Sequence, residues 1–234
     1  MPDAIVMLFV DLARDAARLL VPVACAGCGF DDVPLCESCS APWWDSPFRA
    51  EEGAGRLDVI GRERLPVWAV AELDGPVQRA VGVWKDGRRR DLDGFFAAAA
   101  HRLAQEIRSH LPPGVVVVPV PSRPRSVRRR GVDLSALLAG SVGRALGAPV
   151  ESPLAAAGRS SKGRSSVGRW DAAGVRTVRR LGPRPTVIVD DVMTTGATIA
   201  RAAHALEVAG TPVVGAAVLA ATPRRDVAAG PGYG

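Results

Sequence analysis

The residues of this chain best suited to chemistry stand between Val187 and Thr198, in the run VIVDDVMTTGAT. Two adjacent carboxylates, Asp190 and Asp191, end an apolar stretch typical of a buried strand, and a threonine-rich loop with Gly196 then opens into a helical pattern. Free N–H groups at the start of a helix carry partial positive charge and bind phosphate. Carboxylates beside them can accept hydrogen bonds from vicinal sugar hydroxyls. The run therefore predicts a site for a 5-phosphoribosyl group.

The structural alternative for this run is an ordinary strand-to-helix turn, in which Asp191 or a threonine caps the helix. The complete string after a buried strand favours the binding site. The run is not a Walker A loop, because it lacks the lysine that such a loop requires. The residues predicted to bind the ribose and its 5-phosphate are Asp190, Asp191, Val192, Met193, Thr194, Thr195, Gly196, Ala197 and Thr198.

A second candidate region is the arginine-rich stretch that follows the apolar run 115–121. We expect Ser122, Arg123 and Arg125 in a loop that continues through residues 128–130, all arginine, before a helical pattern begins. Guanidinium groups pair with phosphate oxygens at two points at once. The stretch therefore suits a polyanion, either a small phosphorylated ligand or a nucleic acid backbone. A solvent-exposed basic turn without a ligand is the alternative.

The four cysteines form two C-x-x-C pairs, Cys25 with Cys28 and Cys36 with Cys39, separated by seven residues. Two such pairs can complete a tetrahedral Zn²⁺ site, which would be closed and structural because thiolates fill all four positions. Disulfides are the alternative. The N-terminal run AIVMLFV lacks the basic flank and cleavage pattern of a signal peptide, so we expect a cytoplasmic protein with reduced thiols.

The composition of the 234 residues excludes several classes of protein. With 47% hydrophobic residues the chain is not disordered, and no apolar run reaches the roughly 18 residues that a membrane span requires. A net charge of +6 is compatible with anionic partners. No hydrolase or metalloprotease motif is present, and the three histidines stand singly in helical patterns, where packing or surface roles are expected: His101, His110 and His204.

From Val67 onward, apolar runs alternate with helical patterns, which indicates an α/β fold with a parallel sheet. We expect an N-terminal helix and the cysteine segment in residues 1–45, a linker in 46–66, the main domain in 67–222 and a tail in 223–234. Strands are predicted over 67–73, 115–121, 186–191 and 212–221, and helices over 77–85, 93–111, 134–146 and 197–210.

The run VIVDDVMTTGAT resembles the binding motif of type I phosphoribosyltransferases. This resemblance implies a Rossmann-like parallel sheet, phosphoribosyl pyrophosphate as the ligand, and Mg²⁺ on its pyrophosphate. It also implies that the loop after a neighbouring strand binds the pyrophosphate, which would assign Ser122, Arg123, Arg125 and Arg130 to that group.

Two further segments are similar to the ComF family, the competence-protein branch of these proteins. The string PVPSRPRSVRRRG resembles that family's PVP…R…RG segment, and VGVWKDGRRRDL (81–92) resembles its LK-y-G segment, which places Lys85 with the pyrophosphate-binding residues. ComF-type proteins carry an N-terminal zinc segment, as expected here. The resemblance covers residues 67–222 and implies a role in DNA uptake during natural transformation, with single-stranded DNA and DNA-processing competence proteins as partners.

The stretch 158–175 departs from the ComF pattern R…T…Q…R…N, because only Arg159 and Arg169 can be placed. No catalytic residue is predicted. The sequence is therefore compatible with three hypotheses: a ComF-type protein, a metabolic phosphoribosyltransferase acting on a nucleobase, and a non-catalytic adaptor that binds a phosphoribosyl ligand.

Overall fold

A computed structural model describes residues 23–57, 64–87, 89–156 and 175–223 of the chain. The expected N-terminal helix, Arg159, Arg169 and the tail from residue 224 lie outside the described residues.

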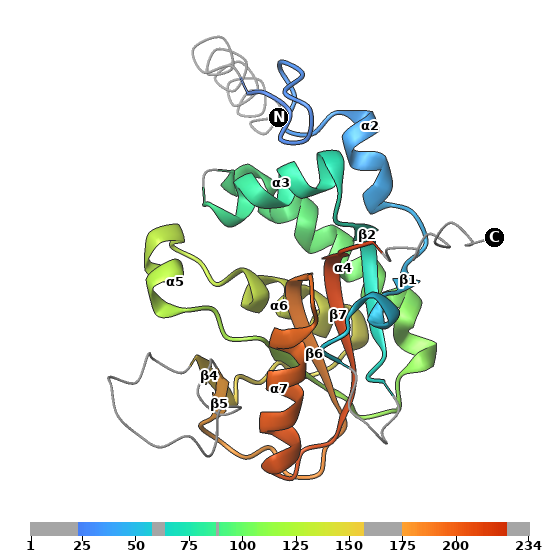
Figure 1. Ribbon diagram of the computed structural model, residues 1–234, viewed down its shortest axis with the longest axis vertical. Helices are drawn as coiled ribbons and strands as arrows, with labels where there is room; N and C mark the ends of the chain where they lie inside the picture. The colour runs from blue at the N-terminus through green and yellow to red at the C-terminus, as the bar shows by residue number, and fades with distance from the viewer. Residues whose placement is uncertain (1–22, 58–63, 88, 157–174, 224–234) are drawn as a thin grey trace, which may run out of the picture.

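One five-stranded sheet, in the order β1-β2-β7-β6-β3, forms the centre of the molecule (Figure 1). Strands β2, β7, β6 and β3 are parallel, and β1 joins the edge antiparallel to β2. The predicted α/β fold with a mostly parallel sheet is confirmed. The strands are β1 (Phe48–Arg49), β2 (Val67–Glu72), β3 (Val116–Pro119), β6 (Thr186–Met193) and β7 (Val213–Ala221).

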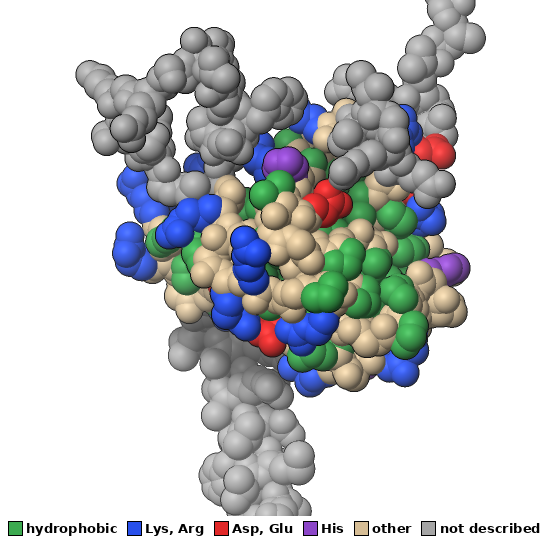
Figure 2. Space-filling model, turned by 90° about the horizontal axis from the view of Figure 1, so that it is seen from below, with side chains coloured by type: hydrophobic (Ala, Val, Ile, Leu, Met, Phe, Trp, Pro, Cys, Tyr) green, Lys and Arg blue, Asp and Glu red, His purple; other side chains and the backbone are tan. Residues whose placement is uncertain are grey.

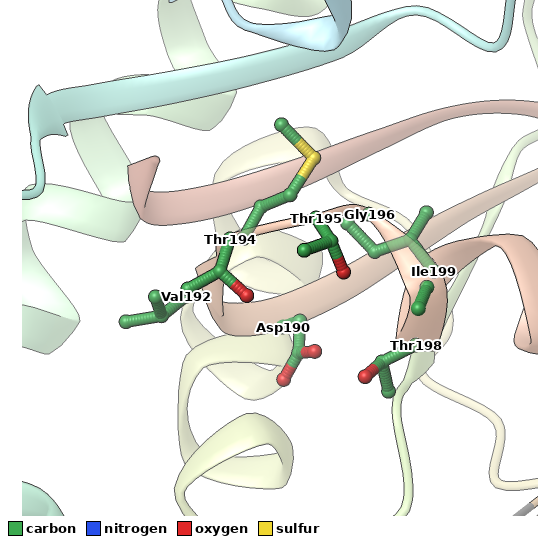
Figure 3. Close-up of a pocket in the computed structure, with 9 residues that line it drawn as sticks. Asp190, Val192, Thr194, Thr195, Gly196, Thr198 and Ile199 are labelled. Carbon is green, nitrogen blue, oxygen red and sulfur yellow. The ribbon is translucent and has the colours of Figure 1, made fainter. Parts of the chain in front are cut away.

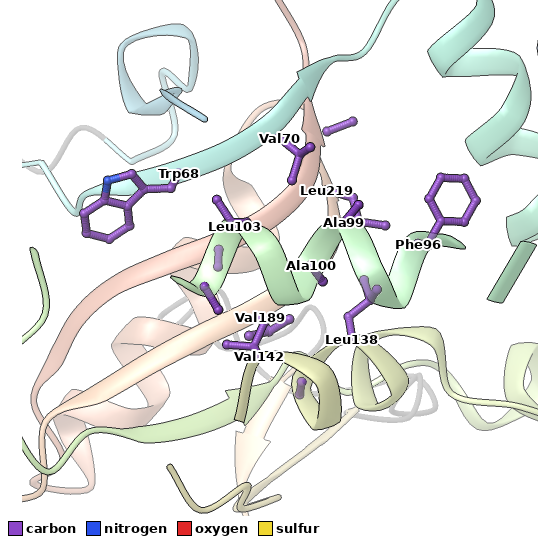
Figure 4. Packing of buried hydrophobic residues seen from close by; sticks show 14 of the residues in the cluster. Trp68, Val70, Phe96, Ala99, Ala100, Leu103, Leu138, Val142, Val189 and Leu219 are labelled. Atoms are coloured by element: carbon purple, nitrogen blue, oxygen red, sulfur yellow. The ribbon is translucent and has the colours of Figure 1, made fainter. Parts of the chain in front are cut away.

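Helices cover both faces of this sheet because its strands carry apolar side chains on both faces. Val117 packs toward α4 and α6, whereas Val116 and Val118 pack into the core on the side of α7. Figure 4 shows the first of these cores, where Leu103 and Leu138 meet the sheet. No helix in the described part of the chain is long and apolar enough to cross a membrane. The main helices are α3 (Gly75–Lys85), α4 (Asp93–Ile107), α6 (Leu134–Leu146) and α7 (Ala197–Val208).

Several short elements complete the fold. Two strands form a small antiparallel sheet apart from the main one, β4 (Leu154–Ala156) and β5 (Val175–Thr177). The short helices and 3₁₀ turns are α2 (Glu37–Ser40), η1 (Ala41–Trp43), η2 (Glu51–Gly53), η3 (Arg90–Leu92), η4 (Arg108–His110) and α5 (Pro124–Arg130).

The stretch 46–66, expected to be a linker, is packed against the sheet where the structure describes it. It contains β1 and η2, and it buries Ala50, Ala54 and Leu57. The carboxylate of Glu51 accepts a hydrogen bond from the N–H of Val67 at 3.1 Å, which ties the stretch to β2. In the sequence, these three apolar residues stand among Pro, Gly and charged residues, which hid their role in the core.

The arginine-rich stretch, expected to be a loop, forms the short helix α5 instead. Pro124 occupies the first turn, where its fixed φ favours a helix start and its missing N–H costs nothing. Gly131 ends the helix in the left-handed conformation, with φ +76°. Pro124 and Gly131 therefore mark the two ends of a helix, whereas the sequence suggested that they belong to a loop.

Candidate functional site

The candidate site lies where β6 ends and α7 begins. A small hollow of about 30 Å³ opens there, which exceeds the roughly 10–15 Å³ that one water molecule requires. Figure 3 shows Asp190 and Thr198 on its rim together with the loop between them. Eight of the nine predicted ligand-binding residues line the hollow, and Ile199 joins them: Asp190, Val192, Met193, Thr194, Thr195, Gly196, Ala197 and Thr198.

The start of α7 is free to bind an anion. Gly196 is the residue before the helix and contributes no side chain, and no side-chain hydrogen bond caps the helix. The first intrahelical bond runs from the N–H of Ala200 to the carbonyl of Gly196 at 2.9 Å. The N–H groups of residues 197–199 therefore have no carbonyl partner within the helix. This geometry disfavours the alternative in which Asp191 or a threonine caps the helix.

Gly196 is required both by its backbone conformation and by its neighbours. Its φ is +75°, and a Cβ atom would lie 2.8 Å from Cγ of Leu57 and 3.0 Å from Cβ of Ala54. The N–H of Arg56 also donates to the carbonyl of Thr195 at 3.2 Å. Residues 54–57 thus pack against the loop between β6 and α7, a contribution that sequence reasoning missed.

Asp190 is buried at the edge of the hollow. One oxygen, Oδ1, accepts hydrogen bonds from the hydroxyl of Ser135 at 3.1 Å and from the N–H of Asp191 at 2.9 Å. Burial, followed by the negative charge of Asp191, raises the pKa of Asp190 to about 7. Near neutral pH this carboxyl group exists in both protonation states, so it can donate or accept a hydrogen bond.

The side chain of Asp191 does not line the hollow and contacts Lys85 instead. Its Oδ1 lies 2.7 Å from Nζ of Lys85, the last residue of α3. The Asp191 side chain is 11% exposed, so the ion pair is largely shielded from water on the carboxylate side. The structure therefore brings Lys85 to the acidic pair, although 106 positions separate it from Asp191 in the sequence.

The remaining predicted pyrophosphate ligands differ in their partners. Arg130 donates to the carbonyl of Lys85 at 3.3 Å, and its buried Nε has no hydrogen-bond partner among the described residues. Ser122 instead donates to Asp133, the residue that caps α6, at 2.9 Å. Arg123 and Arg125 are exposed, and within the described residues no hydrogen bond or ion pair connects them to the site.

Sequence reasoning missed Ser135, which belongs to the first turn of α6 and donates to Asp190. Its only local signal is Asp133 two residues earlier, a helix-capping residue that fixes where α6 begins and therefore which way Ser135 points.

The four cysteines lie together, with all Sγ atoms within 4.8 Å of one another. None forms a disulfide, and the Sγ atoms of Cys28 and Cys36 are 3.6 Å apart. Thiolates at about 2.3 Å from a tetrahedral Zn²⁺ would be roughly 3.8 Å apart. Cys25 and Cys39 are buried, whereas Cys28 is exposed. This cluster could hold a metal ion such as zinc.

No model of a protein family matches the chain, and no curated protein matches it in sequence. Among solved structures, a purine phosphoribosyltransferase from Pyrococcus horikoshii Ot3 is 20% identical, over 57% of this chain and 78% of that one, with a TM-score of 0.37. An adenine phosphoribosyltransferase from Thermoanaerobacter pseudethanolicus is 14% identical, over 61% and 86%, with a TM-score of 0.38. These similarities are weak, so the residues of the site must support any function.

The raised pKa of Asp190 predicts how stability changes with pH. An ordinary aspartate loses its proton near pH 3.8, whereas folded Asp190 keeps it to about pH 7. Between these values the folded state binds more protons than the unfolded state, so the free energy of unfolding falls as the pH rises. Asp190→Asn removes this contribution, and above pH 7 we expect the variant to be more stable than wild type by about 2–4 kcal/mol.

Urea denaturation between pH 4 and pH 8 measures this difference. The control Asp45→Asn, which changes an exposed aspartate outside the site, is expected to follow the wild-type curve. An Asp190→Asn curve parallel to wild type across this range would show that Asp190 ionises normally.

Proposed function

We propose that this protein binds phosphoribosyl pyrophosphate or a related phosphoribosyl ligand at the end of β6. The observation that carries the proposal is the uncapped start of α7 next to the buried carboxyl group of Asp190, in one hollow. The 5-phosphate would accept hydrogen bonds from the N–H groups of residues 197–199 and from exposed threonine hydroxyls. The ribose hydroxyls would meet Asp190 and Asp191 beside it.

The pyrophosphate would lie toward Lys85 and Arg130. Lys85 carries the positive charge nearest to the acidic pair, and the buried Nε of Arg130 is a donor that lacks a partner among the described residues. Mg²⁺, implied by the family resemblance, would be carried on the pyrophosphate. In a transferase, the bond from ribose C1 to pyrophosphate breaks with its electron pair leaving on pyrophosphate, while a nucleobase nitrogen forms the new bond to C1 and releases its proton to water. Positioning and charge stabilisation are what this site offers to that reaction.

Calorimetry with phosphoribosyl pyrophosphate and Mg²⁺ tests the site. We expect Asp191→Ala to weaken binding by about 10- to 100-fold, because hydrogen bonds to charged groups contribute about 1.5–3 kcal/mol. Asp45→Asn serves again as the matched control and should bind like wild type. Absence of binding by the wild-type protein would exclude the proposal.

The same ligand also separates a metabolic transferase from a non-catalytic binder. A transferase releases pyrophosphate when a suitable nucleobase is added, whereas an adaptor binds the ligand and releases none with any base.

We further propose that the metal in the cysteine cluster is one structural Zn²⁺. Four thiolates leave no open position for water, which fits a structural role. Metal analysis is expected to give one zinc per chain in wild type and in Ser40→Ala, and a substoichiometric amount in Cys39→Ser. A purified wild-type protein that takes up no zinc would contradict this assignment.

A ComF-type role in DNA uptake is the finer proposal, and the surface of α5 supports it. The arginines at positions 125, 128 and 129 are exposed on this one short helix. On the face drawn in Figure 2, basic side chains lie among apolar and neutral groups. A compact row of exposed guanidinium groups fits a nucleic acid backbone.

Binding of a single-stranded oligonucleotide at increasing salt tests this role. We expect affinity to fall with salt in wild type, and both affinity and salt dependence to decrease when Arg125 and Arg128 are changed to alanine. Arg180→Ala, at an exposed arginine outside α5, is the control. A salt-independent affinity would count against arginine-mediated DNA contacts.

A further inference from the structure

Arg89 connects the cysteine cluster to the candidate ligand site. We propose that Arg89 is a positioning residue: it transmits the metal-held shape of the Cys segment (residues 23–40) to Lys85, and thereby sets the affinity of the phosphoribosyl ligand. This inference rests on the proposed function for its ligand. Its structural basis is a chain of contacts from the cysteines to Asp191.

The first contact joins Arg89 to the backbone of the Cys segment. The guanidinium donates through NH1 to the carbonyl of Ala24 at 2.7 Å and through NH2 to the carbonyl of Pro34 at 3.0 Å. Nε and NH2 also donate to the carboxylate of Asp91. Because a guanidinium is a rigid planar fork, these bonds fix Arg89 in position and in orientation.

Both carbonyls depend on the cysteines for their positions. Ala24 directly precedes Cys25, and Pro34 stands two residues before Cys36. The N–H of Ala26 bonds to the carbonyl of Pro34 at 3.0 Å, so the two halves of the segment meet at this point. The only regular helix in the segment is α2, which has four residues. A segment with so little secondary structure relies on a bound metal to keep its shape.

The second set of contacts leads from Arg89 to Lys85. Lys85 ends α3, and Arg89 lies within the α3–α4 loop that follows (residues 86–92, described except for residue 88). Gly87 in this loop has φ +76°, and a Cβ atom there would lie 2.9 Å from Cγ of Arg130. Arg130 in turn donates to the carbonyl of Lys85, and Arg90 donates to the carbonyl of Arg130 at 3.4 Å. The loop is therefore held on one side by the Cys segment, through Arg89, and on the other side by Arg130 of α5.

The end of this chain is the ion pair of Lys85 with Asp191. The Lys85 side chain is 38% exposed, so the protein encloses it only in part and its position depends on where its backbone is anchored. When the Cys segment loses its metal, Ala24 and Pro34 cease to hold Arg89, and the loop is anchored on one side only. The ligand must then order Lys85 as it binds, which costs affinity. Couplings between sites typically change affinity by about 5- to 150-fold, and we expect about tenfold here.

The experiment is calorimetry of phosphoribosyl pyrophosphate with Mg²⁺ on the full chain, in zinc-loaded and zinc-stripped forms. For wild type, we expect binding about tenfold weaker after zinc removal. Zinc-loaded Arg89→Ala should already show this weaker binding. Arg79→Ala is the matched control, because Arg79 also donates to the Cys segment, at the carbonyl of Gly27, but lies on α3 outside the loop. It should retain wild-type affinity when loaded with zinc.

Lys85→Met distinguishes positioning from general loss of structure. If Arg89 acts through Lys85, then neither zinc removal nor the additional change Arg89→Ala weakens binding further in the Lys85→Met background. Effects that persist undiminished in this background would overturn the proposal. So would equal affinities of wild type and Arg89→Ala, both loaded with zinc.

Hydrogen exchange separates this inference from the proposed function, because it needs no ligand. Backbone amides of the α3–α4 loop should exchange faster in zinc-loaded Arg89→Ala than in zinc-loaded wild type. If wild type binds no phosphoribosyl pyrophosphate, the proposed function fails, and unchanged exchange in the loop would then show that Arg89 does not hold it either.

Discussion

Two neighbouring carboxylates near the end of a buried strand are costly, because they repel one another and lose hydration together. The two carboxylates have different partners, which lowers this cost. Asp191 is balanced by Lys85 at 2.7 Å, whereas Asp190 accepts hydrogen bonds from Ser135 and from the backbone and has a pKa near 7. The ion pair of Lys85 with Asp191 thus joins α3 to β6. It therefore ties the site to the α3–α4 loop, which begins at the residue after Lys85.

This ion pair also gives a physical reason for the arrangement around it. A phosphoribosyl ligand presents hydroxyls and polyanionic groups side by side, so its site needs acceptors next to positive charge. Asp190 and the start of α7 form one such pair in the hollow, and Lys85, which contacts Arg130, adds positive charge beside Asp191. In the proposed function, the acidic pair would bind the ribose, and the start of α7 and Lys85 would meet the phosphate groups.

Much of the architecture followed from local sequence patterns. The apolar run before Asp190 predicted a buried strand, although β6 continues two residues further, to Met193. Local patterns could not reveal the support of Gly196 by Leu57, because 139 residues separate them and the stretch around Leu57 is rich in Pro, Gly and charge. The same limit applies to Lys85 and Asp191: family resemblance brought Lys85 into consideration, but only the fold shows which group it contacts.

In the proposed function, the hollow between Asp190 and α7 holds the phosphate and ribose of the ligand. A crystal structure of the protein with ribose 5-phosphate tests it most directly. The account predicts phosphate oxygens about 3 Å from the N–H groups of residues 197–199, with ribose hydroxyls at Asp190 or Asp191. A sugar phosphate bound instead by the arginines of α5, with the start of α7 left to solvent, would contradict it.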